Sequence, residues 1–486
     1  MTVKNDRLPS SDTLPRLDWL AQHAEPAPPG HFNELRGSAE PSDTQGLTPT
    51  WSTFFQLSAL TNPNQPQLFP LLLTAQDWQG IAQGVLQRVQ LLEQVMADVY
   101  GPQRVLHQAL LPPALVLGHP DYIRALRGVT PVGETHLHTV ALDLVRSPQG
   151  PWWVVAQHTQ TPAGLGDVLE NRSRMTQRFP QAFNALQIQP LNHLGQDWMA
   201  ALRQRCPTGA DAHIVMLASG ATPANDAGAA SLARALGVPL VTGHDLTVRD
   251  QHLYLNTAHG PVPVHGLLKH LDDALLDPLA LRADATLGVP GLLQVIQARH
   301  VLVANAPGSG FLESPALLGF LPALCEALRG ETLRLPSLPT WWCGERAVFN
   351  QVQYRLASSV IKPSFPWGLP GLPHRNPVRG RELSAHDQDV WRARMAQQSE
   401  DFSLQDEAPF SHMPVWHATD HGGRLELQKI SLRVFAIAQQ PGQWEVLPGG
   451  LAQLSSPEQN CVDMPRERVS TDVWVSSACA PTAESH

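Results

Sequence analysis

Residues 131–164 carry the pattern that most constrains the fold of this chain. HLHTVALDLVR alternates apolar and polar residues before it becomes apolar, SPQG supplies turn residues, and PWWVVAQHTQ is typical of a returning strand. The first predicted strand carries one carboxylate, Asp143. A hairpin with a carboxylate facing polar residues of its second strand is a common frame for a metal–phosphate site. Here the second strand offers no carboxylate, only Ala156, Gln157, His158 and Gln160.

Charge and hydropathy exclude several classes of protein. The chain has 486 residues, a net charge of −9 and a pI of about 6.1, so we expect no broad cationic surface for nucleic acid or an anionic membrane. Apolar runs such as LPPALVLG are too short to span a bilayer, and the N-terminus lacks the apolar stretch of a secretory signal. These features predict a cytoplasmic protein without nucleic-acid or membrane partners.

Helical and strand patterns divide the rest of the chain. Residues 1–50 are rich in Pro, Ser, Gly and acidic residues, which is typical of a disordered leader. Apolar residues at helical spacing predict a helix over 74–100 that ends at Gly101 and Pro102. HIVMLAS, DAGAASLARALG and VPLVTG follow one another as strand, helix and strand, which indicates a parallel, Rossmann-like unit within 211–300. LTVRDQHLYLNT predicts a hairpin, and the C-terminal third is rich in strands.

Several motifs allow both a functional and a structural interpretation. The Gly-rich NAPGSGFLES follows a predicted strand and could approach a phosphate, or it could be a plain turn. Lys362 lies in the apolar SSVIKPSF, so it either contacts a phosphate or reaches solvent at the strand end. The segment 269–284 is most simply a solvated helix start with acids near its N-terminus, although it could line a substrate site. His136 and His138 could face one ion from a strand, but no third ligand is in reach, which favours ordinary hydrogen bonds.

The order of these motifs resembles one family. QRVQLLEQVMADVYGPQRVL, RGVTP, HLHTVALDLVR, TPAG with LENRSRM, LDDALLDPLALRADATLGVPGLL, NAPGSGFLESPALLGFLPAL, LPTWWCGE, IKPSF, SLRVFA and LPGGLAQL look like the circularly permuted type 2 ATP-grasp proteins. These are relatives of the synthetase half of glutathionylspermidine synthetase, and the resemblance covers about residues 67–477. It implies a mixed α/β chain with a circularly permuted ATP-grasp fold and an inserted Rossmann-like pre-ATP-grasp domain. The expected division is a leader at 1–50, the metal-site half at 51–205, the Rossmann-like domain at 206–300, the nucleotide-binding region at 301–480 and a tail at 481–486.

The resemblance also implies an activity and its residues. ATP would phosphorylate a carboxylate and an amine would attack the acyl phosphate, with Mg²⁺ neutralising the phosphate charge. Asp143 would bind the metal, and Arg146 and Arg433 would act in catalysis. The implied ATP-binding residues are Lys362 on the phosphates, Gln405 near the adenine, and Asn305, Gly308, Gly310 and Glu313 in the Gly-rich turn. The implied substrate residues are Arg124, Arg127, Asp272 and Asp273.

Departures from the family pattern concentrate on the metal site. Ala156 and His158 stand where the family has a glutamate and an asparagine, and imidazole is a poor magnesium ligand. Two hypotheses follow. The chain is either an ATP-dependent carboxylate–amine ligase with a ligand-poor site, or a catalytically degenerate partner or regulatory subunit that binds nucleotide only. Related chains work with a helical alpha-E domain or a transglutaminase-like protein, so such a partner is expected in trans.

Overall fold

The computed structural model describes residues 21, 24, 26–38, 46–58, 67–191, 193–220, 223–365, 376–418, 423–455 and 469–477. The predicted tail at 481–486 and most of the predicted leader at 1–50 lie outside these residues. Within them, no helix is both long and apolar enough to cross a membrane. The described N-terminal residues pack on the folded body, because Asn33 forms a β-bridge with His412 and Leu35 is fully buried.

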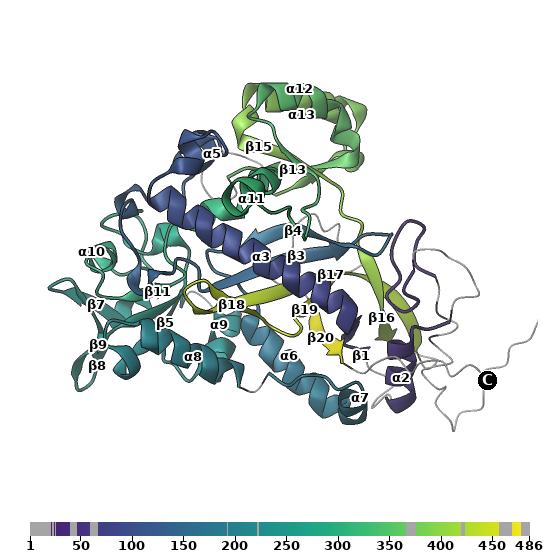
Figure 1. Cartoon of the computed structure of the whole chain (residues 1–486), viewed down its shortest axis with the longest axis horizontal. Coiled ribbons are helices and arrows are strands. Elements are labelled where there is room, and N and C mark those ends of the chain that lie inside the picture. Colours follow the sequence, from purple (N-terminus) through teal and green to yellow (C-terminus); the bar gives the residue numbers. More distant parts are fainter. Residues whose placement is uncertain are drawn as a thin grey trace, which may run out of the picture.

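A nine-stranded sheet runs through the middle of the molecule (Figure 1). Its long strand β17 (Arg424–Gln440) pairs antiparallel with β3 (Thr139–Arg146), which in turn pairs antiparallel with β4 (Trp152–His158). The hairpin predicted within 131–164 is therefore confirmed. The other strands of this sheet are β1 (Gln67–Leu68), β2 (Leu71–Thr74), β16 (Ser411–His417), β18 (Gln443–Val446), β19 (Leu451–Ser455) and β20 (Ser470–Ser476).

The predicted long helix is α3 (Ala75–Tyr100), which packs against this sheet at β17 and β18 (Figure 1). Its apolar residues recur at helical spacing, so one face is buried in the main core while the other meets solvent. The helix begins where the hydroxyl of Thr74 accepts the backbone N–H of Asp77 at 3.1 Å, and it ends at Gly101.

Removing the cap of α3 is expected to have a modest effect. Thr74→Ala should lower the free energy of unfolding by about 1 kcal/mol, because one N–H of the first turn loses its acceptor. Urea denaturation followed by circular dichroism measures this. Thr74→Ser keeps the hydroxyl and serves as the matched control, so an equal loss in both variants would contradict the capping role.

A second sheet has four parallel strands in the order β11-β10-β5-β6. The strands are β5 (Ile214–Ala218), β6 (Leu240–Val241), β10 (Gly266–His270) and β11 (Leu302–Ala304). The chain passes from β5 through α9 (Pro223–Leu236) to β6, which confirms the predicted strand–helix–strand unit. It then returns to the other side of β5 to form β10 and β11, so the strand order reverses between β5 and β10. Helix α8 (Leu194–Arg205) packs against α9 on this sheet, and α6 (Leu165–Arg178) packs against α9 as well.

Two smaller sheets complete the fold. The predicted hairpin at 246–257 is confirmed in the antiparallel β7 (Leu246–Arg249), β8 (His252–Thr257) and β9 (Gly260–Val264). A four-stranded sheet in the order β12-β15-β13-β14 packs with α12 and α13 around its own core, which holds the buried Cys343. Its elements are β12 (Thr340–Trp342), α12 (Arg346–Val352), β13 (Ser359–Pro363), β14 (Val378–Arg379), α13 (Ala385–Gln397) and β15 (Phe402–Asp406). The remaining α-helices of the described residues are α2 (Pro49–Leu57), α4 (Arg104–His107), α5 (Pro113–Leu117), α7 (Pro180–Ala185), α10 (Leu292–Gln297) and α11 (Leu321–Arg329).

Candidate functional site

A cluster of charged side chains joins the three adjacent strands β17, β3 and β4. Asp143 lies directly opposite Arg433 in the sheet, and its two oxygens accept from Arg433 Nε at 2.6 Å and Nη2 at 2.8 Å. His158 Nε2 approaches the second of these oxygens at 2.7 Å. Arg433 also donates from Nη1 to the carbonyl of Ala163 at 3.1 Å. Both oxygens of Asp143 are therefore occupied by cationic or donor side chains.

Burial makes the pairing of Asp143 and Arg433 strong. Asp143 is only 1% exposed, and burial alone would raise the pKa of its carboxyl. The charges and hydrogen bonds of Arg433 and His158 together outweigh burial and leave that pKa well below its usual range. Burial would likewise lower the pKa of Arg433, but the charge of Asp143 raises it. The two groups therefore stay ionised at neutral pH.

The donor set around Asp143 does not fit the magnesium ion implied by the resemblance. Mg²⁺ requires near-octahedral oxygen ligands, whereas the oxygens of Asp143 face Arg433 and His158. Ala156 of β4 pairs with Asp143 of β3, and its methyl side chain has no atom that could bind a metal ion. Among the described residues, no group of three His, Cys, Asp or Glu side chains could hold a metal ion. The guanidinium of Arg433 supplies the positive charge at this place instead.

Asn305 fastens the Gly-rich segment to the hairpin. Its Oδ1 accepts the backbone N–H groups of His138 at 2.6 Å and Thr139 at 2.9 Å. Its Nδ2 donates to the carbonyls of Thr139 and Thr159, both at 2.6 Å. Because both ends of the amide are used within the protein, Asn305 positions the turn; its predicted contact with ATP stays a prediction.

The glycines and the glutamate of this segment bring it close to β4. Glu313 Oε1 accepts the backbone N–H groups of Thr159 and Gln160, both at 2.6 Å. Gly308 has a φ of +93°, and a Cβ there would lie 1.9 Å from the hydroxyl oxygen of Tyr100. A Cβ at Gly310 would lie 2.5 Å from a carboxylate oxygen of Asp121 and 2.5 Å from the amide nitrogen of Gln160. Only glycine allows the turn to approach these side chains.

The segment 269–284 differs from the solvated helix start that its composition predicts. Lys269 and Asp273 are buried rather than solvated, with Lys269 Nζ 2.6 Å from Asp273 Oδ1 and 2.8 Å from the carbonyl of Gln160. Asp273 also accepts the N–H of Gly308 at 2.7 Å. The prediction of a solvated helix start is wrong here, because the two opposite charges neutralise each other and can be buried together. Asp272 is half-buried beside them.

Asp121 belongs to the same cluster of buried charged side chains as Lys269 and Asp273, and the sequence alone did not single it out. It is 5% exposed, and burial raises the pKa of its carboxyl to about 7, with further increases from the charges of Asp273, Glu313 and Asp272. The positive charge of Lys269 lowers the pKa of Asp121 in part. The segment GHPDY carries no motif that marks Asp121, so only the tertiary structure reveals its neighbours.

Lys362 and Gln405, for which the resemblance implies contacts with the phosphates and near the adenine of ATP, lie on neighbouring strands. Lys362 on β13 is 2% exposed, which excludes the alternative of a lysine reaching solvent. Gln405 on β15 is 1% exposed and donates to Thr340 Oγ1 at 2.9 Å and to the carbonyl of Val155 at 3.3 Å. Gln405 thus connects the four-stranded antiparallel sheet with β4 of the large sheet.

The remaining predicted arginines lie apart from the ion cluster. Arg146 forms ion pairs with Glu34 and Asp77, both at 3.0 Å, and its guanidinium lies 4.1 Å from the ring centre of Phe32. Arg124 and Arg127 are exposed at the short 3₁₀ helix Arg124–Leu126. The catalytic role of Arg146 and the substrate roles of Arg124, Arg127, Asp272 and Asp273 stay predictions.

Known proteins resemble this chain in sequence and in fold. The uncharacterised protein Rv2567 of Mycobacterium tuberculosis is 32% identical over 418 residues, which cover 86% of this chain and 45% of that protein. This chain therefore spans about half the length of that relative, and the match covers less than half of it. A second uncharacterised M. tuberculosis protein, Rv2411c, is 30% identical over 98% of this chain and 85% of its own length. The structure of a glutathione synthetase-like effector from Globodera pallida has a TM-score of 0.55 at 11% identity, covering 84% of this chain and 88% of that chain.

The family model of the circularly permuted ATP-grasp proteins of type 2 matches residues 70–455. The match includes the hairpin with Asp143, the Rossmann-like sheet, the Gly-rich turn and the strands of Lys362 and Gln405. The chain therefore belongs to the circularly permuted ATP-grasp type 2 family.

Proposed function

We propose that this chain is a nucleotide-binding ATP-grasp protein in which an ion cluster replaces the metal centre. The observation that carries the proposal is the arrangement of Asp143, whose oxygens are both held by Arg433 and His158. Releasing Asp143 to a metal would leave a buried guanidinium without its counter-charge, which is costly. The chain then acts as a partner or regulatory subunit, alongside an alpha-E-domain or transglutaminase-like protein, rather than as a metal-dependent ligase.

The nucleotide would bind through residues of the four-stranded antiparallel sheet and of the Gly-rich turn. Lys362 brings a buried cation to β13, which suits the phosphates of ATP. Gln405, on the neighbouring strand, would lie on the adenine side. The turn that contains Gly308 and Gly310 lies beside the end of β4, and backbone N–H groups of such turns are good phosphate donors; the N–H of Gly308 itself is already bound to Asp273. The negative charge of the phosphates would be balanced by the ammonium of Lys362 and by these donors.

A second candidate is the ATP-dependent ligase that joins a carboxylate to an amine. One observation favours it. The carboxyl of Asp121 has a pKa of about 7 and lies near Lys269, Asp272 and Asp273, two of which are predicted substrate residues. A carboxyl that titrates near neutral pH can accept a proton from an attacking amine, as a general base must.

Calorimetric titration with ATP, paired with an assay for ADP release, separates the two candidates. We expect ATP to bind equally well, within about twofold, in EDTA and in excess Mg²⁺, and no ADP to form with the chain alone. Lys362→Met should weaken binding at least about tenfold, because a buried cation that faces phosphate is lost.

Lys429→Met is the matched control, since Lys429 is a partly exposed lysine on β17, and we expect it to bind ATP like the wild type. ADP release that requires Mg²⁺ and is lost in Asp143→Asn would establish the ligase and overturn the first proposal. An absence of ATP binding in both buffers would contradict both candidates.

A further inference from the structure

A fully buried arginine of α3 is held by an amide, a carbonyl and a hydroxyl. Arg88 is 0% exposed. Its guanidinium donates to the carbonyl of Leu335 at 2.8 Å, to Ser337 Oγ at 3.0 Å and to Gln157 Oε1 at 3.3 Å. Burial lowers the pKa of Arg88 to about 9, although the nearby Cys325 raises it in part, so the group is still charged at neutral pH. Because a buried charge is costly without hydrogen bonds, these three acceptors have to stay in place around it.

Two of these acceptors belong to the linker 335–338, which leads from α11 into β12 of the four-stranded antiparallel sheet. The N–H and the carbonyl of Val154 on β4 both bond to the linker backbone, at 2.9 and 2.8 Å. Gly84, one turn of α3 before Arg88, gives the linker room, because a Cβ at this position would lie 2.4 Å from the Cβ of Leu335. Arg88 therefore fixes the place where the chain enters the sheet of the proposed phosphate and adenine contacts.

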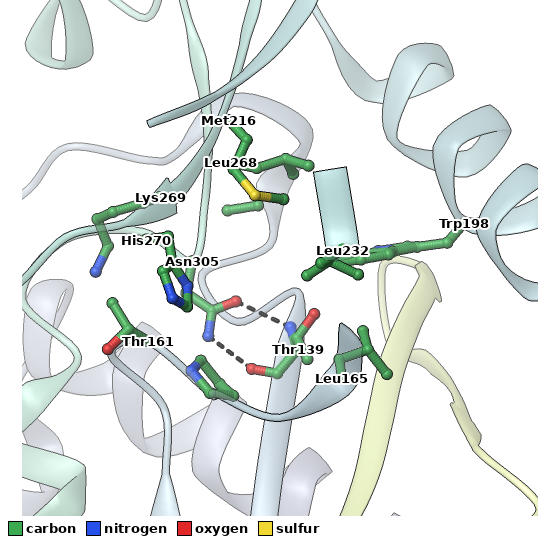
Figure 2. Close-up of a pocket in the computed structure, with 12 residues that line it drawn as sticks. Thr139, Thr161, Leu165, Trp198, Met216, Leu232, Leu268, Lys269, His270 and Asn305 are labelled. Atoms are coloured by element: carbon green, nitrogen blue, oxygen red, sulfur yellow. Dashed lines mark hydrogen bonds between the residues drawn. The ribbon is translucent and has the colours of Figure 1, made fainter. Parts of the chain in front are cut away.

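The third acceptor, Gln157, joins the same arginine to the Gly-rich turn. Gln157 is 2% exposed, and its Nε2 donates to the carbonyl of Leu312 at 2.6 Å while its Oε1 accepts from Arg88. An amide carries a donor and an acceptor, so it serves both partners at once, whereas an ionised carboxylate could only accept. Towards the start of the Gly-rich segment, Asn305 bonds to Thr139 of β3, as Figure 2 shows. A buried amide therefore holds the segment at both ends.

Arg88 and Gln157 thus form a relay, a pair of buried side chains that connects the Gly-rich turn with the linker. The turn and the linker lie far apart in the sequence from both members of the relay. Protein interiors are closely packed, so a displacement at one end of the relay has to be accommodated at the other end rather than by solvent.

We infer that Arg88 and Gln157 are positioning residues that fix the Gly-rich turn and the linker relative to each other, and with them two walls of the nucleotide site. The effect on nucleotide affinity rests on the proposed function, whereas the relay itself does not. Gln157→Glu separates positioning from core filling. It keeps the size of the side chain and an acceptor for Arg88, but it loses the donor to the carbonyl of Leu312.

Hydrogen–deuterium exchange with mass spectrometry, on the full chain without nucleotide, tests the relay. In Gln157→Glu we expect backbone exchange in 308–314 to rise at least about fivefold, while exchange in 335–338 stays within about twofold of the wild type. Arg88→Met removes the group that holds both parts, so exchange should rise in both segments. In a calorimetric titration, Gln157→Glu should bind ATP at least about threefold more weakly than the wild type, because the turn is no longer fixed.

Gln87→Met is the matched control. Gln87 is another buried glutamine of α3, 4% exposed, and its side chain bonds to residues 331–334 just before the linker. The variant should raise exchange in 331–334, leave exchange in 308–314 unchanged and bind ATP like the wild type.

A thermal melt shows which variants have folded, and if Gln157→Glu has not, Gln157→Met takes its place, since it also removes the donor. Unchanged exchange of the turn in the folded Gln157 variant would overturn the inference, and so would an equal rise in Gln87→Met. If the wild type binds ATP and the loosened variant binds it equally well, the positioning role is overturned. A wild type that does not bind ATP contradicts the proposed function, and the exchange measurement then decides the relay alone.

Discussion

Arg433→Met is expected to lower the free energy of unfolding by about 3–5 kcal/mol. Asp143 is 1% exposed, and both hydrogen bonds from the guanidinium disappear in this variant. The remaining neighbour, His158, lies at 2.7 Å from one oxygen only, so the carboxylate keeps a large part of its desolvation cost. Urea denaturation at pH 7 measures the loss.

A double variant distinguishes an unpaired charge from a simple packing defect. Arg433→Met combined with Asp143→Leu removes both charges, and we expect the pair to be more stable than Arg433→Met alone. Arg282→Met serves as the control, because its ion pair with Asp284 is exposed at the surface and should contribute nothing measurable. If the double variant lost as much as the sum of the two single variants, the ion cluster would not be the source of the effect.

Asp121→Asn is expected to change how stability depends on pH. The carboxyl of Asp121 has a pKa of about 7 in the folded chain, against an ordinary value of 3.8 for an aspartate side chain. The folded state therefore binds the proton more tightly than the unfolded state. The stability from this proton is fully present below the unfolded pKa and is lost as the pH rises through the folded pKa near 7. Between about pH 5 and pH 8 the wild type should lose roughly 2–3 kcal/mol through this group, at about 1.4 kcal/mol per pKa unit.

An amide side chain at position 121 cannot ionise, so Asp121→Asn should lack this part of the slope. Urea denaturation at pH 5 and pH 8 measures the difference between the two proteins. The titratable groups that face Asp121 are Asp273, Glu313, Asp272, Lys269 and His119, whose Nδ1 lies 3.8 Å from the Asp121 carboxylate, and all of them stay in the variant. Asp389→Asn, at an exposed carboxylate of α13, is the control and should keep the wild-type slope. Parallel pH profiles of Asp121→Asn and wild type would contradict the raised pKa.

Local patterns predicted the elements of this fold well. The alternating strands of the hairpin, the helical spacing over 74–100 and the strand–helix–strand order of the Rossmann-like unit are each properties of residues close in sequence. The same holds for the turn at Asp250 and Gln251, which both adopt positive φ between β7 and β8. The order of the motifs was sufficient for the family, which the match over residues 70–455 confirms.

The candidate site could be predicted only in part, because its contacts join distant parts of the chain. Asp143 was singled out as the lone carboxylate of the hairpin, but its pairing with Arg433 depends on the register between β3 and β17. The burial of Lys269 with Asp273 was not predicted, because composition shows charged residues without showing that they neutralise each other.

By itself, the sequence determined the central hairpin, the helix over 74–100, the strand–helix–strand unit, the family and the absence of a carboxylate on the strand opposite Asp143. These follow from local periodicity, from motif order and from residue identity. Only the tertiary structure decided that Arg433 and His158 hold the two oxygens of Asp143, and that Asp121 is buried among acidic side chains. The physical reason is that burial and charge pairing depend on which strands become neighbours, and folding sets that between residues far apart in the chain.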